Sequence, residues 1–437
     1  MNKTSNNTIK FIDLFAGLGG IRIGFEQALH DMGFNPKAVF SAEIKSHAIK
    51  AYRENFNENS CYDITKINEE NIPDFDFLLA GFPCQAFSNA GKRLGFEDTR
   101  GTLFFDVVRI IKAKNPKGFL LENVEGLVTH NNGKTLHVML EILNDLGYTV
   151  SYAVLDGLNF GLAQSRKRIY ICGSKAGHQI PMSNFNKKSS VLSDIIEGEV
   201  PSIETKFTKK LFSHFSIEDV IGKQIKDKRG GNNNIHSWDF ALKGDVSEEQ
   251  KRLLSILLKQ RRNKKWAELY GIDWMDGMPL TLDMIRTFFE SKSLKEILND
   301  LVNKNYLVLE HPKKKVGNRR VYDETLEKGY NIVTGKLSFE FNRILDPMDI
   351  SPTLVATDMS KLAVPVRSGI RPLTVREGLR LFGFPESYTL NTIKKNEAFD
   401  LIGNTVCIPV IKEISKLLIS AELMGCEDDV EIIRRIA

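Results

Sequence analysis

The chain has 437 residues, of which 42% are apolar and 26% charged, enough for two domains or for one domain with a large insertion. No apolar run reaches the length of a membrane span, residues 1–7 lack a signal-peptide core, and five widely spaced cysteines form neither a metal-binding pair nor a disulfide ladder. These features exclude a membrane protein and favour a reducing cytoplasm. The net charge of +5 is too small to identify a partner, and the eight histidines show no ligand spacing, so we predict no metal site.

Strand-like and helix-like segments alternate over residues 9–175. Apolar runs predict strands, and helical spacing of apolar residues predicts helices. The strands are expected at 11–15, 39–42, 75–80, 118–121 and 169–172, and the helices at 21–30, 46–55 and 102–114. This alternation predicts an α/β fold with a doubly wound, mainly parallel sheet.

A different pattern occupies residues 191–345. Residues 228–234 are rich in Gly and Asn and are expected to form a flexible loop. Two amphipathic stretches follow, and then an apolar run, a basic turn and a short strand, which together suit a winged-helix-like module. Their ranges are 281–290, 294–303, 306–310, 313–320 and 321–322.

Positive charge is concentrated in the same part of the chain. Residues 201–330 hold 25 Lys and Arg against 19 Asp and Glu, and the basic turn 313–320 concentrates the excess further. A basic turn of this kind is an electrostatic footprint for a polyanion, although a solvated loop would have the same composition. Beyond it, residues 397–418 return to a loop and a helix around Gly403-Asn404-Thr405.

A glycine-rich turn joins the first predicted strand to the first predicted helix at residues 13–20. It departs from the dinucleotide fingerprint because Gly20 follows Gly19 directly, so it suits a nucleoside without a phosphate better than a dinucleotide. By itself, the turn also fits an ordinary tight connection in an α/β fold.

Acidic and apolar residues near this turn complete a candidate nucleoside site. Glu43 ends the second strand, where an acidic residue can bind ribose hydroxyls, and Asp63 is placed to accept from an adenine amino group. Phe15 and Ile44 are placed to sandwich the base. Taken singly, the carboxylates could be ordinary strand ends.

Three further motifs lie beside predicted strands. In Gly81-Phe82-Pro83-Cys84-Gln85 a thiol follows a proline at a strand end, where open α/β sheets place their chemistry. Glu122-Asn123-Val124 ends the next strand, and Gln164-Ser165-Arg166-Lys167-Arg168 precedes the strand at 169–172. A thiol, a carboxyl group and two guanidiniums suggest one assembled site. Each of these residues could instead have a purely structural role. A cysteine at a strand end is often just a small buried side chain, and two arginines on one strand can alternate between faces, so one of them could pair with a surface carboxylate.

This ordered set of motifs resembles the DNA (cytosine-5)-methyltransferases of bacterial restriction–modification type. The resemblance covers roughly residues 9–175 and 341–415. Residues 95–101 are similar to the family's mobile loop, and residues 371–377 to the segment behind its target-recognition region. Three positions depart from the common pattern: Ile44 replaces a frequent Trp, Ala163 a frequent Pro, and Thr405 a frequent Ser.

The resemblance implies an S-adenosylmethionine-dependent methyltransferase fold with an inserted domain. The catalytic domain would span 1–190, completed by 395–437, and the target-recognition domain 191–394. Cofactor-binding positions carried over by the motifs are Phe15, Ala16, Gly17, Gly19, Gly20, Glu43, Ile44, Asp63, Ile64, Pro83, Leu103, Asn404 and Thr405. DNA-binding positions are Gln85, Ser88, Lys92 and Arg100, in a segment that could otherwise be an ordinary surface loop.

The resemblance also implies catalytic roles. The Cys84 thiolate would add to carbon 6 of a flipped-out cytosine and make carbon 5 nucleophilic. Glu122 would hold or donate a proton at ring nitrogen 3, and Arg168 would bind the ring carbonyl oxygen. Arg166 would orient Glu122 or the Cys84 loop, and Asn123 would hold that loop. The base that removes the carbon 5 proton is not identified.

We therefore expect a monomeric, cytoplasmic bacterial enzyme that methylates carbon 5 of cytosine at a specific site in duplex DNA. A cognate restriction endonuclease would be its genetic partner. The alternatives are a tRNA cytosine-5 methyltransferase on the same fold, which usually has a shorter insert, and a catalytically silent DNA-binding relative. The recognition sequence and the base-reading residues within 191–394 cannot be read from the sequence.

Overall fold

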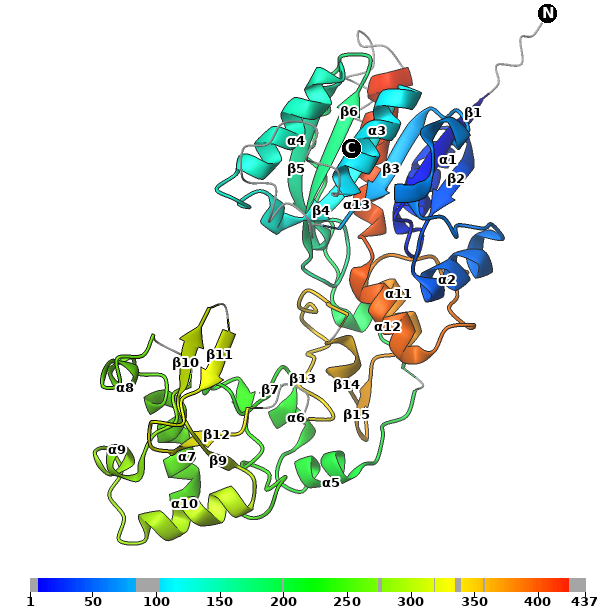
Figure 1. Ribbon diagram of the computed structural model, residues 1–437. Helices are drawn as coiled ribbons and strands as arrows, with labels where there is room; N and C mark the ends of the chain where they lie inside the picture. The colour runs from blue at the N-terminus through cyan, green and yellow to red at the C-terminus, as the bar shows by residue number, and fades with distance from the viewer. Residues whose placement is uncertain are drawn as a thin grey trace, which may run out of the picture. The chain divides into compact units, whose positions relative to one another are not determined.

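The computed structural model describes residues 7–83, 103–198, 200–273, 277–317, 319–334, 339–356 and 358–423 (Figure 1). Their contacts divide the chain into two compact units. The first unit comprises the chain up to Glu197, Pro347–Met359 and the chain from Thr374 onward. The second comprises Gly198–Asp346 and Ser360–Leu373.

These units differ from the predicted division at 190/191 and 394/395. Residues 374–394 lie with the first unit because the helix that begins this segment packs against the helix that precedes Thr405. In this contact, a Cβ added to Gly378 would lie 3.2 Å from the Ile402 side chain. Thr374 caps the helix and also donates a hydrogen bond to Glu197 at 2.5 Å, which ties the segment to the end of the first unit.

A six-stranded sheet forms the centre of the first unit, in the order β2-β1-β3-β4-β6-β5. Neighbours pair in parallel, except that β6 is antiparallel to both β4 and β5. The strands are β1 (Thr8–Leu14), β2 (Asn35–Ala42), β3 (Phe77–Gly81), β4 (Gly118–Val124), β5 (Thr149–Asp156) and β6 (Lys167–Ser174). The predicted doubly wound, mainly parallel sheet is confirmed.

Helices cover both faces of this sheet, as strand alternation requires (Figure 1). On one face, Ile12 and Leu14 of β1 join the apolar core made with α3 and α4. On the other face, Phe11 contacts Phe25 of α1 with ring centroids 5.2 Å apart. The helices of this unit are α1 (Gly20–Asp31), α2 (Ser46–Phe56), α3 (Leu103–Lys114), α4 (Lys134–Asp145), α11 (Val375–Arg380), α12 (Lys395–Asn404) and α13 (Ile408–Leu423).

The first predicted strand has different bounds in the structure, and the segment after Cys61 is irregular. β1 ends at Leu14 because Phe15 has φ 57°, in the left-handed region. Tyr62 and Asp63 begin no strand: a single bridge joins Glu43 to Cys61, and a short 3₁₀ turn follows at Ile64–Lys66. Helix α4 and strand β5, which complete the far side of the sheet, were not predicted from the sequence.

The second unit contains a five-stranded sheet in the order β15-β14-β13-β7-β8. Its strands are β7 (Gln224–Ile225), β8 (Asn234–Ile235), β13 (Arg343–Ile344), β14 (Leu362–Val366) and β15 (Gly369–Pro372), and its neighbouring helices are α5 (Lys206–Phe212) and α6 (Ile217–Val220). An apolar cluster that includes Ile225, Phe207 and Leu211 packs against one face of this sheet.

A separate apolar cluster supports a helical module in the same unit. Leu294, Leu298 and Leu301 bury one side of α10, at the spacing that the sequence predicted. The two predicted helices are followed by a hairpin, but its strands differ from the prediction. The basic segment expected as a turn forms β10 and β11, which pair with each other, and β9 pairs antiparallel with β12 instead of with residues 321–322. The elements are α7 (Glu248–Gln260), α8 (Lys265–Glu268), α9 (Leu282–Arg286), α10 (Leu294–Asn303), β9 (Leu307–Glu310), β10 (Lys313–Val316), β11 (Arg319–Tyr322) and β12 (Gly329–Ile332).

No helix in the described ranges combines the length and the apolar character that crossing a bilayer requires.

Candidate active site

A cavity of about 540 Å³ opens at the carboxyl ends of the parallel strands in the first unit. This is the edge where open α/β sheets bind ligands. The cavity brings together most of the residues predicted from the motifs: Phe15, Ala16, Gly17, Gly20, Glu43, Ile44, Asp63, Ile64, Pro83, Leu103, Glu122, Arg166, Arg168, Asn404 and Thr405.

The turn between β1 and α1 forms one wall of the cavity. Phe15 and Gly17 have φ values of 57° and 54°, and the left-handed conformation of a residue as large as Phe15 costs on the order of 1 kcal/mol. Gly19, at φ 71°, does not line the described cavity; a Cβ there would lie 2.5 Å from the Phe56 ring. Gly19 therefore serves the turn and its packing, whereas Gly17 and Gly20 face the cavity.

Glu43 accepts one backbone hydrogen bond from this turn and two from the residues that follow it. Its Oε2 accepts from the Gly17 N–H at 2.8 Å, and its Oε1 accepts from the N–H groups of Ile44 and Lys45, each at 2.8 Å. A carboxylate offers about four acceptor positions. Glu43 thus holds the turn in place and keeps acceptor capacity toward the cavity.

Asp63 and Ile44 form the wall next to Glu43. The Asp63 carboxylate accepts from the Thr65 hydroxyl at 2.7 Å and pairs with Lys66 at 2.9 Å, and these contacts lower the pKa of Asp63. Asp63 is therefore ionised near neutral pH. Ile44 has 73% of its surface exposed and presents an apolar side chain to the cavity.

The segment before α13 closes the cavity against the β1–α1 turn. A Cβ on Gly20 would lie 3.0 Å from the Thr405 hydroxyl, and a Cβ on Gly403 would lie 2.3 Å from the backbone nitrogen of Ala356. Glycine is needed at both positions because neighbouring chain segments approach this closely.

Glu122 and Arg168 form an ion pair inside the cavity. Arg168 pairs in the sheet with Val124, two residues from Glu122, so both side chains project from one face. Their Nε and Oε1 atoms are 3.1 Å apart. Burial raises the pKa of Glu122, and the Arg168 and Arg166 guanidiniums only partly offset this effect. The carboxyl group consequently takes up a proton more readily than an exposed glutamate does.

Arg166 points to backbone carbonyls. Its Nη1 donates to Leu354 O at 2.8 Å, and its Nη2 donates to Gly403 O at 3.1 Å and to Thr405 O at 2.8 Å. Burial and the neighbouring Arg168 lower the pKa of Arg166 to about 10, so it remains a cation at neutral pH. Arg166 thereby holds the loop that carries Asn404 and Thr405.

Asn123 holds the chain just before the predicted nucleophile. Its Nδ2 donates to the carbonyl oxygen of Phe82 at 2.9 Å, and Pro83 lines the cavity. Cys84 and the predicted DNA-contacting residues Gln85, Ser88, Lys92 and Arg100 lie outside the described residues.

Several residues of the site were missed from the sequence. Asp156, at the end of β5, accepts from the Arg166 N–H at 2.7 Å and from the Ser165 hydroxyl at 2.8 Å. Tyr62, Val355 and Ala356 line the cavity. Strand β5 was not predicted, and nothing local links residues 355–356 to a motif some 190 positions earlier.

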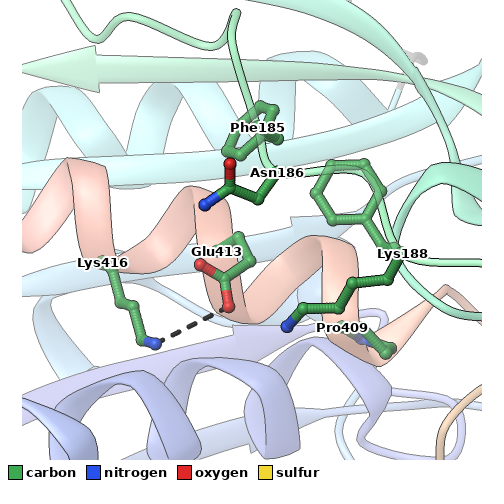
Figure 2. Close-up of a pocket in the computed structure, with 7 residues that line it drawn as sticks. Phe185, Asn186, Lys188, Pro409, Glu413 and Lys416 are labelled. Carbon is green, nitrogen blue, oxygen red and sulfur yellow. Dashed lines mark ion pairs between the residues drawn. The ribbon is translucent and has the colours of Figure 1, made fainter. Parts of the chain in front are cut away.

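A second cavity of about 210 Å³ lies along α13 in the first unit (Figure 2). Figure 2 shows Lys416 reaching toward Glu413 on this helix, with Nζ and Oε1 3.6 Å apart. Lys416 also pairs with Asp31 at 2.9 Å, so nearby carboxylates balance its charge. None of the residues predicted for catalysis or cofactor binding lines this cavity in the part of the chain that the structure describes.

The first unit is thus an α/β core whose strand ends carry a cavity with carboxylate and apolar walls, a buried carboxyl group of raised pKa and a guanidinium beside it. The family model of the C-5 cytosine-specific DNA methylases matches residues 9–420. The chain therefore belongs to this family and is a DNA (cytosine-5)-methyltransferase.

Comparison with individual proteins supports the same family. The type II methyltransferase M.NlaIV of Neisseria lactamica is 57% identical over 94% of this chain and 99% of its own length. The type II methyltransferase M.BanI of Aneurinibacillus aneurinilyticus is 40% identical over 93% of this chain and 94% of its own. Among solved structures, the S. pombe Dnmt2 methyltransferase matches with a TM-score of 0.51 at 16% identity, over 95% of this chain and 98% of that one, which shows a shared fold.

Proposed function

We propose that this protein uses S-adenosylmethionine to methylate carbon 5 of a cytosine at a specific site in duplex DNA. The observation that carries the proposal is the Glu122–Arg168 pair in the same cavity as the glycine-rich turn. One cavity can then hold a methyl donor and the groups that activate a pyrimidine.

The cavity residues suit this cofactor. A volume of about 540 Å³ falls within the roughly 300–1,000 Å³ that is typical of ligand sites. Glu43 and Asp63 offer carboxylate acceptors for hydroxyl and amino groups, while Phe15 and Ile44 offer apolar surface for a base. When bound, S-adenosylmethionine supplies an electrophilic methyl group on a sulfonium.

The protein's own groups would prepare the cytosine. The Cys84 thiolate adds to carbon 6, and the protonated Glu122 carboxyl donates a proton to ring nitrogen 3, which limits the charge that builds on the ring. Arg168, whose Nε lies 3.1 Å from Glu122 Oε1, would donate to the ring carbonyl oxygen. After methyl transfer, a base such as water takes the carbon 5 proton, and the electron pair of that C–H bond restores the double bond between carbons 5 and 6. The bond from carbon 6 to sulfur then breaks, Cys84 leaves as a thiolate, and the proton on ring nitrogen 3 returns to Glu122.

Arg166 would act as a positioning residue. Its three hydrogen bonds to backbone carbonyls favour a role in shaping the Asn404–Thr405 wall over direct contact with the pyrimidine. This refines the predicted role, in which Arg166 orients Glu122 or the Cys84 loop.

The second unit would provide target recognition. Its basic hairpin, β10–β11, carries Lys313, Lys314, Lys315, Arg319 and Arg320 in eight residues of strand. Cationic side chains of this density suit the phosphate backbone. The type II relatives further suggest that methylation protects DNA from a partner restriction endonuclease, and we propose a monomeric enzyme in a bacterial cytoplasm.

The test supplies purified protein with labelled S-adenosylmethionine and either unmethylated plasmid or tRNA. We expect label in the plasmid only, and bisulfite sequencing should map it to one short motif. Cys84→Ser should abolish labelling, whereas Cys61→Ser, at an exposed free cysteine, should retain it. Label in tRNA alone would overturn the proposal.

A further inference from the structure

Two walls of the 540 Å³ cavity come from segments that lie far apart in the sequence. Residues 43–45, which lead into α2, line one side, and Asn404 of α12 lines another. A charged cluster joins the two walls. The Asp400 carboxylate of α12 accepts from Lys45 Nζ, and its Oδ2 lies 3.1 Å from His47 Nε2. We call these three residues, Lys45, His47 and Asp400, the α2–α12 bridge.

Local helix preferences do not explain why Lys45 stands where it does. Lys45 is the N-cap residue of α2, and its side chain caps no backbone N–H group. N-cap positions favour Ser, Thr, Asp and Asn, and a positive charge there opposes the helix dipole. Burial alone would raise the pKa of Asp400, but the contacts with Lys45 and His47 lower it overall, so Asp400 is ionised near neutral pH. Lys45 is therefore suited to the contact with α12 rather than to the helix that it begins.

The far end of α2 is held firmly to the segment that precedes α12. The Glu54 carboxylate accepts from the hydroxyl groups of Thr389 and Thr392, at 2.6 and 2.5 Å. It also accepts from the backbone N–H groups of Asn391 and Thr392, at 2.9 and 3.1 Å. Asn55 Oδ1 accepts from the Thr389 N–H at 2.9 Å. Five hydrogen bonds thus fix this end of the helix.

The cavity end of α2 is tied to α12 by exposed charges. The side chains of Lys45 and Asp400 are 40% and 38% exposed, and that of His47 is 21% exposed. Exposed ion pairs stabilise a contact only weakly, because water and salt compete with them. Ile44, which presents its side chain to the cavity, directly precedes Lys45. The helix is therefore anchored at one end and can open at the end beside Ile44.

We propose that Asp400 is a positioning residue for the cofactor: through Lys45 and His47 it holds the wall that carries Ile44 against α12, and opening of the α2–α12 bridge sets the rate of cofactor exchange. A ligand that contacts both walls can enter or leave more easily when the walls separate. The inference rests on the proposed function, because it takes the cavity to be the site of S-adenosylmethionine and of its product, S-adenosylhomocysteine.

The first test measures the association and dissociation rate constants of labelled S-adenosylhomocysteine. This ligand carries one positive and one negative charge, so a change of one protein charge acts on it only weakly. Each exposed ion pair shifts an equilibrium by about 1.4–5-fold. Asp400→Ala removes two such contacts and should raise both rate constants by about 2–30-fold, while their ratio, the Kd, changes less than either of them.

Asp31→Ala is the matched control. The Asp31 carboxylate also joins two cations of another helix, Lys412 and Lys416, each at 2.9 Å, and its side chain is 41% exposed. It does not line the described cavity, so its loss should leave both rate constants unchanged. Equal rate constants in the two variants would overturn the proposal. A faster dissociation in Asp400→Ala with unchanged association would also overturn it, because Asp400 would then contribute affinity without controlling exchange.

The second test restores the bridge with its charges exchanged. Asp400→Lys places a cation beside Lys45 and His47, so both rate constants should rise at least as far as in Asp400→Ala. The double variant Lys45→Asp/Asp400→Lys regains an opposite pair and should return both toward the wild type. Asn404 Nδ2 donates to the main-chain oxygen of Asp400 at 2.8 Å, a bond that all these variants can keep. Rate constants that stay high in the double variant would overturn the proposal.

The outcomes distinguish this inference from the proposed function. If the wild type binds S-adenosylhomocysteine and Asp400→Ala exchanges it as the control does, the α2–α12 bridge does not set the rate and the proposed function stands. If the wild type binds neither S-adenosylhomocysteine nor S-adenosylmethionine, the proposed function fails and this inference fails with it.

Discussion

Arg166 offers the sharpest test of how the cavity is built. The guanidinium bridges three carbonyls from two chain segments that lie far from it in sequence, at 2.8, 3.1 and 2.8 Å, and only 2% of the residue is exposed. It also lies over the Phe382 ring, 5.0 Å from the centroid. Lysine keeps the positive charge but presents a single nitrogen in place of a planar fork.

Arg166→Lys should leave at least one buried carbonyl without a donor, at a cost of about 1–3 kcal/mol. Removal of the guanidinium over Phe382 adds about 0.5–2 kcal/mol. We therefore expect the free energy of unfolding to fall by about 1.5–5 kcal/mol, a large part of the roughly 5–15 kcal/mol that is typical of a domain. Because Asn404 and Thr405 lose their support, KM for S-adenosylmethionine should rise more than kcat falls.

Urea unfolding measures this decrease, provided that the m value stays unchanged. Arg376→Lys is the matched control, because Arg376 also bridges two carbonyls, at 3.3 and 2.8 Å, but lies nearer to solvent. Its decrease should be about 1 kcal/mol or less, since water can replace the missing donor. Equal decreases in the two variants would refute the idea that Arg166 supports the cavity.

Three other groups of residues give further predictions. Glu122→Gln should lower kcat by roughly 10²–10⁴-fold without loss of stability. The activity of the wild type should decline as pH rises through the raised pKa of Glu122, because the carboxyl group then loses the proton that it donates. A flat pH profile would exclude the role of Glu122 as proton donor. Burial raises the pKa of Asp13, so the stability that its carboxyl group contributes is complete below the pKa of the unfolded chain and is lost as pH rises through the pKa of the folded state. The melting temperature of Asp13→Asn relative to wild type should therefore increase from pH 4 to pH 8. A difference in melting temperature that stays constant over this range would contradict this sign. Lys313 and Lys315 lie on one face of β10, and neutralising both should flatten the salt dependence of DNA binding. Lys314→Gln should flatten it less, because Lys314 lies on the other face and pairs with a carboxylate at 3.2 Å. Equal slopes in the two variants and the wild type would show that the hairpin faces solvent.

The sequence predicted those elements whose structure depends on the spacing of neighbouring residues. The apolar spacing of Leu294, Leu298 and Leu301 predicted a helix over the same residues that form α10. Glu122 and Arg168 could be assigned to one site because each lies beside a strand end, and strand ends gather at one edge of the sheet.

Contacts between distant segments were beyond such patterns. Nothing near Arg166 indicates that it contacts Leu354 or Gly403, since those partners lie about 190 and 240 residues away. Gly19 belonged to a recognisable motif, yet its packing against Phe56 depends on where α2 lies. Motifs therefore predicted which residues would come together, while tertiary contacts determined which of them face the cavity.

Two turns adopt conformations that their amino-acid composition did not predict. Phe15 was expected to continue a strand, but its left-handed backbone starts the turn toward α1. The loop at 228–234 has the Gly and Asn content of a flexible segment, whereas the Arg261, His236 and Lys223 side chains fix it. In both cases the surrounding structure outweighs the local preference.

The central claim is that the Cys84 sulfur adds covalently to the target cytosine. The most direct measurement incubates the protein with S-adenosylmethionine and a duplex that carries 5-fluorocytosine at the mapped site, and then identifies the linked peptide by mass spectrometry. The fluorine blocks release after methyl transfer, so a stable adduct at Cys84 is expected, unchanged in Cys61→Ser and absent in Cys84→Ser. Methylation of ordinary DNA without any trapped adduct, or an adduct at another residue, would contradict the account.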